Sequence, residues 1–215
     1  MTTETTRTLS TDQVQAIASC SQILGALYLQ DPKQESSWPL LDELRERDSL
    51  EDWPFGSSEQ RAQASALIHE GLASTSYAAL AREYQRLFIG PHHFEAPAWG
   101  SVYLDKDQVL FGCSTLELRQ WMRANGIAIT EEKREPEDHI GKMLVLLGWL
   151  AREKPALIPE YLGYHVMTWA SRYLELLRHH AQNPFYEGLA LLTEITLDGL
   201  SRELEVVPRQ RPVYR

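Results

Sequence analysis

The stretch Glu135-Pro136-Glu137-Asp138-His139 places three carboxylates and an imidazole within five residues. A carboxylate beside a histidine can work as an acid/base pair, and the same groups can recognise a ligand through hydrogen bonds. A cation is disfavoured near a helix N-terminus, so we expect a neutral His139 that both donates and accepts hydrogen bonds. The structural alternative is that Pro136 opens a helix whose first turn the acids stabilise. We expect Asp138 and His139 at the solvent-facing end of this helix.

A second cluster is aromatic and precedes the first along the chain. Its members are large apolar groups at the end of an expected helix and in the segment after it, 89–113, where helical periodicity disappears: Leu87, Phe88, Pro91, Phe94, Pro97, Trp99 and Tyr103. Apolar groups of this size on a surface loop usually mark a binding site. The alternative is that they fold back as a lid on the core, and the two interpretations differ in solvent exposure.

Other chemistry has little support in the sequence. His92-His93 with Glu95 offers metal-ligand types, but adjacent histidines rarely point at one ion. Cys20 and Cys113 lie far apart and form no C-x-x-C motif. Phosphate-binding glycine loops, the H-E-x-x-H motif and the nucleophile elbow are all missing from the sequence. We therefore expect no metal, no cofactor and no enzymatic activity.

Charge and hydropathy restrict which partners and which cellular location we expect for this protein. The 215 residues carry a formal net charge of −9, which disfavours a nucleic acid partner and favours a basic ligand. The longest uncharged apolar stretch, Met143 to Ala151, is nine residues, about half of the roughly 20 that cross a bilayer. The polar start of the sequence lacks the features of a secretory signal. A cytoplasmic protein without a membrane span is expected.

The sequence pattern predicts helices for the elements that must position these residues, and strand signals are almost absent. The expected helices are 12–29, 38–47, 59–72, 77–88, 116–124, one opened by Pro136, 158–181 and 184–204, in a single all-α domain spanning 1–215. The helix opened by Pro136 is expected to be buried nearly all round, and Ser114 to cap the helix at 116. The long loop around 89–113 exceeds ordinary connections and indicates a functional segment. Short strands at 102–104 and 109–111 are an alternative within it.

Several runs of residues resemble the TorD/DmsD family, and the DmsD branch in particular. They are YQRLFIGP at 84–91, PAWGSVYLD at 97–105, FGCST at 111–115, LRQWM at 118–122, EPEDH at 135–139 and NPFY at 183–186. The resemblance is specific over residues 77–152, and its most diagnostic part is the E-P-x-D-H motif.

The resemblance implies an all-helical cytoplasmic chaperone without catalysis. Such a protein binds the twin-arginine signal peptide of a molybdoenzyme catalytic subunit, and the expected client here is of the dimethyl sulfoxide reductase type. It holds the client until the molybdenum cofactor is inserted and then releases it for Tat export. The Tat translocase and molybdenum-cofactor biosynthesis proteins are further implied partners. Carried over by motif, the signal-peptide residues are Leu87, Phe88, Pro91, Trp99, Asp138 and His139, with Tyr84, Gly100, Tyr103, Glu135 and Glu137 in support.

The residues alone leave two alternatives open. One is a small hydrolase that uses Asp138 and His139. The other is an adaptor that self-associates through the aromatic loop. A receptor for a twin-arginine signal needs an apolar groove flanked by carboxylates, and the two clusters supply both.

Overall fold

The computed structural model describes residues 9–46, 50–90, 94–128 and 135–215, and within these ranges it holds ten α-helices and no β-strand. The all-α expectation is therefore confirmed. The α-helices are α1 (Thr11–Leu29), α2 (Trp38–Glu43), α3 (Ser58–Ala73), α4 (Tyr77–Tyr84), α5 (Gly100–Leu104), α6 (Cys113–Ala124), α7 (Ile140–Glu153), α8 (Ile158–Tyr161), α9 (Ala170–His180) and α10 (Pro184–Glu203). Two 3₁₀ turns, η1 (Glu35–Ser37) and η3 (Pro155–Leu157), and two π-helical segments, η2 (Gln85–Ile89) and η4 (Leu162–Val166), complete the order.

Local sequence explains why the long helices start where they do. Ser10 and Ser57 each form a capping box with the glutamine three residues later, at the starts of α1 and α3. Asn183 caps α10 by accepting the Phe185 N–H, and Pro184 occupies the first helical position, where no intrahelical N–H bond is lost.

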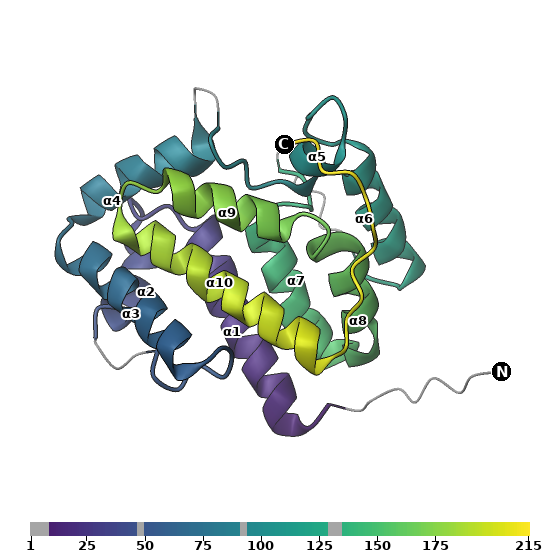
Figure 1. Ribbon diagram of the computed structural model, residues 1–215, viewed down its shortest axis with the longest axis horizontal. Helices are drawn as coiled ribbons and strands as arrows, with labels where there is room; N and C mark the ends of the chain where they lie inside the picture. The colour runs from purple at the N-terminus through teal and green to yellow at the C-terminus, as the bar shows by residue number, and fades with distance from the viewer. Residues whose placement is uncertain (1–8, 47–49, 91–93, 129–134) are drawn as a thin grey trace.

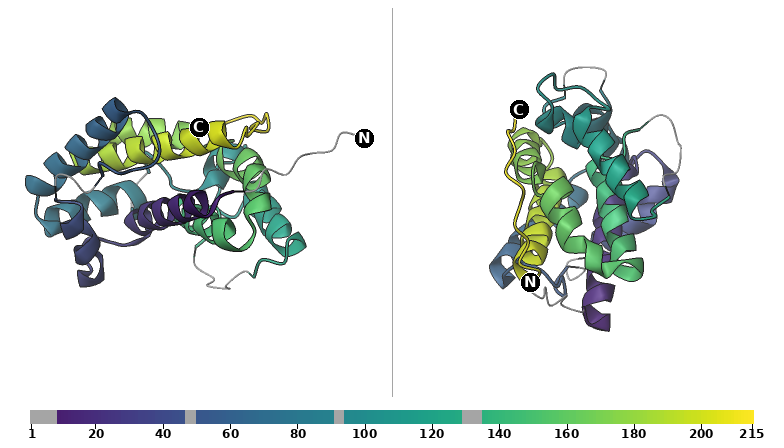
Figure 2. Two further views of the ribbon diagram at one scale, coloured as in Figure 1. Left: turned by 90° about the horizontal axis from the view of Figure 1, so that it is seen from below. Right: turned by 90° about the vertical axis from the view of Figure 1, so that its right-hand side faces the viewer.

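One pair of helices and one group of three build the core. Helix α1 packs along α7, while α10 lies between α3 and α9, and α5, α6 and α8 gather at one end of the molecule (Figures 1 and 2). Buried hydrogen bonds connect the two groups, since the Tyr28 hydroxyl in α1 lies 3.1 Å from Thr193 Oγ1 in α10. The last ten residues, 206–215, which we call the strap, run in extended form from α10 past η4 and α6 to α5 (yellow in Figure 1).

The expected helix boundaries are mostly confirmed, but one expected helix is shorter and another is divided in two. Helices 12–29, 59–72 and 184–204 appear nearly as expected, and α2 ends at Glu43 rather than extending to 47, which lies outside the described residues. The single helix expected over 158–181 is wrong. The π-helical η4 and a turn separate α8 from α9, and Trp169 leaves the helical conformation with φ −144°.

The hydrophobic helix differs from expectation at its start and on its outer side. It begins at Ile140 and not at Pro136, because residues 137 and 138 form a turn and His139, which pairs with Trp99, has an extended backbone. Val145 and Trp149 are 41% and 38% exposed, so the expectation that this helix is buried nearly all round is wrong. The helix packs mainly against α1 and presents its outer side to solvent.

The long loop of the sequence is partly helical. The alternative of short strands at 102–104 and 109–111 is wrong, because Val102 to Leu104 form the end of α5. Ser114 is not the cap of α6, which starts one residue earlier. Instead, the Asp105 carboxylate accepts the Cys113 N–H at 2.9 Å and closes the loop onto the helix start.

No helix in the described ranges is long and apolar enough to cross a membrane.

Close contact between α1 and α7 depends on a missing side chain at Gly25. A Cβ there would lie 2.7 Å from Val145 Cγ2 and 2.9 Å from the Gly141 carbonyl oxygen. We predict that Gly25→Ala lowers the free energy of unfolding by about 2 kcal/mol, as overpacking of a tight core does. Urea denaturation measures it, with Gln22→Ala on the exposed side of α1 as control, expected within about 0.5 kcal/mol of wild type. Equal stability of the two variants would mean that the helices can separate at no cost.

Candidate functional site

Two segments far apart in the sequence meet in a short antiparallel pairing. Trp99 and His139 face each other, the Gly100 N–H donates to the Asp138 carbonyl at 3.0 Å, and the Ile140 N–H donates to the Ala98 carbonyl at 2.8 Å. We call residues 98–101 and 138–140 the clasp. It joins the start of α5 to the start of α7, so it brings the aromatic cluster and the E-P-x-D-H motif together as expected.

Asp138 holds the clasp from within and is only 3% exposed. Its Oδ2 accepts the Ser101 N–H at 2.6 Å and so satisfies an amide in the first turn of α5. Burial raises the pKa of Asp138, while the Ser101 amide and the nearby hydroxyls of Ser101 and Thr115 act in the opposite direction. The expectation that Asp138 and His139 meet solvent is therefore wrong, because the pairing with residues 98–101 covers both.

His139 is the N-cap of α7 and is 4% exposed. Its Nδ1 accepts the Gly141 N–H at 3.1 Å, and its ring lies 5.3 Å from the Trp99 ring in an edge-on contact. Burial, with a smaller contribution from Lys142, lowers the pKa of His139 to about 3. The neutral imidazole that the sequence predicts is what this environment favours.

Asp138 and His139 are engaged in separate backbone contacts. The carboxylate serves the Ser101 amide, and the imidazole Nδ1 serves the Gly141 amide. An acid/base pair would need the imidazole to be oriented by the carboxylate and directed at a reacting group. The local geometry thus gives both residues a positioning role.

The aromatic residues fold back on the core. Trp99 is 7% exposed and lies 5.6 Å from the Phe94 ring, and Tyr103 is fully buried and stacks on Trp169 at 5.4 Å. A Cβ at Gly100 would lie 2.8 Å from Trp169 Nε1, so this glycine lets the clasp approach the ring. The interpretation of these side chains as an exposed apolar patch is wrong, and the lid interpretation is confirmed for them.

The remaining predicted residues divide between the core and the edge of the clasp. Tyr84, Leu87 and Phe88 are buried. A chain of ring contacts runs from Phe88 through Tyr28 and Tyr173 to Tyr103, with centroids 6.0, 6.1 and 6.3 Å apart.

At the edge of the clasp, Glu137 binds Arg119 at 2.5 Å, and Glu135 lies 3.7 Å from His139 Nε2. Pro91 falls outside the described residues, as do His92 and His93. Glu95, which the sequence grouped with those histidines, faces His180 at 3.8 Å.

Sequence reasoning missed the exposed part of this region. Val109, Leu110 and Phe111, which we call the apolar tip, are 48%, 44% and 42% exposed, and Leu116 nearby in the sequence is 55% exposed. Phe111 has a φ of +59°, a strained conformation for a bulky side chain. The Arg119 guanidinium lies 5.4 Å from the Phe111 ring, which places the apolar tip beside α6 and Glu137. The run Val-Leu-Phe between polar residues was the available signal.

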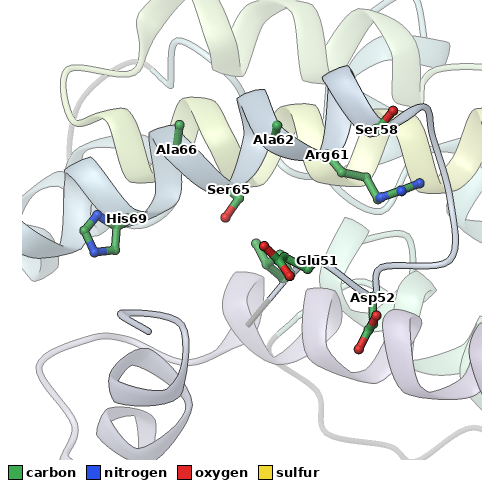
Figure 3. Close-up of a pocket in the computed structure, with 9 residues that line it drawn as sticks. Glu51, Asp52, Ser58, Arg61, Ala62, Ser65, Ala66 and His69 are labelled. Atoms are coloured by element: carbon green, nitrogen blue, oxygen red, sulfur yellow. The ribbon is translucent and has the colours of Figure 1, made fainter. Parts of the chain in front are cut away.

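A larger cavity lies elsewhere, with a volume of about 770 Å³ between α3 and residues 50–52. Arg61, Ser65 and His69 on α3 face Glu51 and Asp52 across it (Figure 3). None of the residues predicted from the sequence lines this cavity. A smaller cavity of about 10 Å³, room for about one water molecule, borders Asp138, Trp169 and Arg211.

The fold is similar to that of a solved structure. A crystal structure of a putative redox enzyme maturation protein from Archaeoglobus fulgidus matches with a TM-score of 0.50 and 17% identity, covering 89% of this chain and 98% of that one. At this identity the likeness concerns the fold alone.

Sequence comparison defines the family more narrowly. The family model for the nitrate reductase delta subunit matches residues 57–183, which include both halves of the clasp. The Tat proofreading chaperone DmsD of Salmonella typhimurium is 38% identical over 92% of this chain and 95% of its own length, and the probable one of Haemophilus influenzae is 36% identical over 92% and 97%. The chain belongs to the nitrate reductase delta subunit family, which includes the TorD and DmsD chaperones, and the resemblance found in the sequence is confirmed.

The burial of His139 and His165 leads to a prediction of how the free energy of unfolding depends on pH. Burial lowers the pKa of His139 to about 3 and that of His165 to about 4. The unfolded chain therefore binds more protons below pH 6.5, and stability should fall as pH drops from about 6.5 toward 4. Each histidine should contribute a loss of about 2 kcal/mol between pH 6.5 and 5.

His139→Asn, which keeps a side-chain acceptor at the N-cap, should lose about 2 kcal/mol less than wild type over that interval. Urea unfolding at pH 6.5 and pH 5 measures the difference. His179→Gln, at an exposed position of α9, is the control. The same pH dependence in His139→Asn and wild type would show that His139 takes up its proton in the folded state.

Proposed function

We propose that this protein is a chaperone for the twin-arginine signal peptide of a molybdoenzyme catalytic subunit, of the dimethyl sulfoxide reductase type. It holds the signal until cofactor insertion is complete and then releases the client for Tat export. The observation that carries the proposal is the 38% identity to Tat proofreading chaperones named DmsD over 95% of their length.

The surface beside the clasp has the chemistry that such a peptide needs. A twin-arginine signal offers two guanidinium groups followed by an apolar segment. The apolar tip supplies exposed apolar area, and two residues supply carboxylates: Glu117 on α6 and Glu137, the ion-pair partner of Arg119. The contact of the Arg119 guanidinium with the Phe111 ring supports a site where a guanidinium lies against an aromatic face.

The site residues inferred from the family resemblance would then act mainly by holding other segments in place, and not by contacting the peptide. Trp99, Asp138 and His139 hold the segments on which the apolar tip and α6 depend, while Leu87 and Phe88 support them through the aromatic core. Pro91 belongs to the same proposal. Direct contact of Trp99 or His139 with a peptide would require the clasp to open.

Further parts of the proposal concern the cellular setting. A cytoplasmic location suits a protein that meets its client before export, and the Tat translocase and the molybdenum-cofactor biosynthesis proteins are the partners that a release step would need. The net charge of −9 favours encounter with a basic peptide, mainly through the association rate and in a salt-dependent way. The named chaperones among the relatives support a binding role without turnover.

Isothermal titration with a signal peptide tests the function. A twin-arginine peptide should bind at least tenfold more tightly, about 1.4 kcal/mol, than the same peptide with both arginines replaced by glutamine. Val109→Ser with Leu110→Ser should weaken binding by a similar factor at unchanged stability, because both side chains are exposed. Trp149→Ser, at an exposed position on α7, is the matched control. Equal binding of the arginine and glutamine peptides would contradict the proposal.

A further inference from the structure

The strap leaves α10 through a defined turn. The Val206 N–H donates to the Ser201 carbonyl at 2.8 Å and the Glu205 N–H to the Arg202 carbonyl at 3.3 Å, with Glu205 at φ +52°. This is the Schellman arrangement, which ends a helix and redirects the chain. Pro208 and Pro212 then favour an extended path.

Backbone bonds pin the strap to the same end of the molecule as the clasp. The Arg209 N–H donates to the Gly163 carbonyl at 2.9 Å, and the Tyr214 N–H donates to the Tyr103 carbonyl at 2.8 Å. The Gln108 side chain, next to the apolar tip, donates to the Tyr214 carbonyl at 3.0 Å. The strap therefore runs beside the surface to which we assign the client peptide, as its path over α6 toward α5 shows (Figures 1 and 2).

Two arginines of the strap converge on one carboxylate. Arg211 Nη1 lies 2.7 Å and Arg209 Nη1 lies 3.8 Å from Glu117 Oε2. The Arg209 guanidinium also lies 5.8 Å from the centre of the Tyr164 ring. Residues 206–215 contain three arginines and no acidic residue, so the strap is a basic extended peptide bound by its own chain.

The attachment of the strap is mostly polar and partly open to solvent. Val207, Val213 and Tyr214 are 83%, 43% and 43% exposed, while Glu117 is 41% exposed. The longer ion pair, of the 52% exposed Arg209, is individually weak, whereas Arg211 is 14% exposed in the shorter one. Displacement of the strap breaks these polar contacts and no bond within the helices, and its tethering to α10 gives it a high effective concentration as a competitor.

We propose that the strap is an internal stand-in for the client, and that Glu117 and Tyr164 form the surface that receives an arginine of the signal peptide. The inference rests on the proposed function and adds a regulated site to it. In the resting chain Arg209 and Arg211 occupy that surface, and a client peptide must displace them. The strap thereby lowers the affinity for peptides that offer only one part of the signal, such as an apolar segment without arginines.

The test frees Glu117 in the full-length chain. Arg209→Ala with Arg211→Ala is compared with Arg123→Ala with Arg152→Ala, two exposed arginines whose removal changes the net charge equally. Circular dichroism verifies the fold of each. We expect the strap variant to bind the twin-arginine peptide about fivefold more tightly than the control variant, the amount that a few weak surface ion pairs can supply. Adding Glu117→Gln to the strap variant should abolish that gain.

A second probe separates this inference from the proposed function. A synthetic peptide of residues 206–215 should bind the strap variant, and the same peptide with glutamine in place of Arg209 and Arg211 should not. Equal affinity of the strap and control variants for the twin-arginine peptide would overturn the inference and leave the chaperone function standing. Binding of the 206–215 peptide with no binding of any twin-arginine signal would overturn the function and support the arginine surface. Failure of both peptides to bind the strap variant overturns the inference.

Discussion

The functional end of this protein depends on the buried hydrogen bond from the Ser101 amide to Asp138. The first amides of a helix have no acceptor within the helix. The Asp138 carboxylate accepts the Ser101 N–H at the start of α5, and the neighbouring His139 imidazole accepts the Gly141 N–H at the start of α7. Two helix starts are thus fixed by consecutive residues, with backbone pairing on either side. A buried donor that loses its acceptor costs about 1–3 kcal/mol, so the bond from the Ser101 amide to Asp138 constrains the segments attached to both helices.

What is attached is the surface proposed for the client. Helix α5 leads into the apolar tip, and Asp105 at its end closes that loop onto α6. Helix α6 carries Glu117 and Arg119, and Arg119 returns to the clasp through Glu137. The buried clasp residues Asp138 and His139 therefore position a surface that other residues form. The strap lies on that surface through contacts that are weaker than those beneath it.

The sequence was a good guide where local chemistry decides and a poor one where distant segments meet. Periodicity and caps predicted α1, α3 and α10 because each is specified by its own residues. The motif around Asp138 was rightly paired with Trp99, but only through resemblance. Pro136 is an acceptable helix start on local grounds, and the pairing of residues 98–100 with 138–140 overrides it. Burial of Trp99 and the ion pairs of Glu117 likewise depend on contacts that no local pattern encodes.

Amide hydrogen exchange of Gly100, Ser101 and Ile140 in wild type and Asp138→Ala tests the central role of the clasp most directly. The three amides should exchange slowly and with one common opening free energy in wild type, because one structure protects them. Asp138→Ala should accelerate all three together by about 30-fold, or about 2 kcal/mol, while amides in α3 keep their wild-type rates. Acceleration confined to the Ser101 amide, with Gly100 and Ile140 unchanged, would contradict the account, since Asp138 would then support one bond and not the joined helix starts.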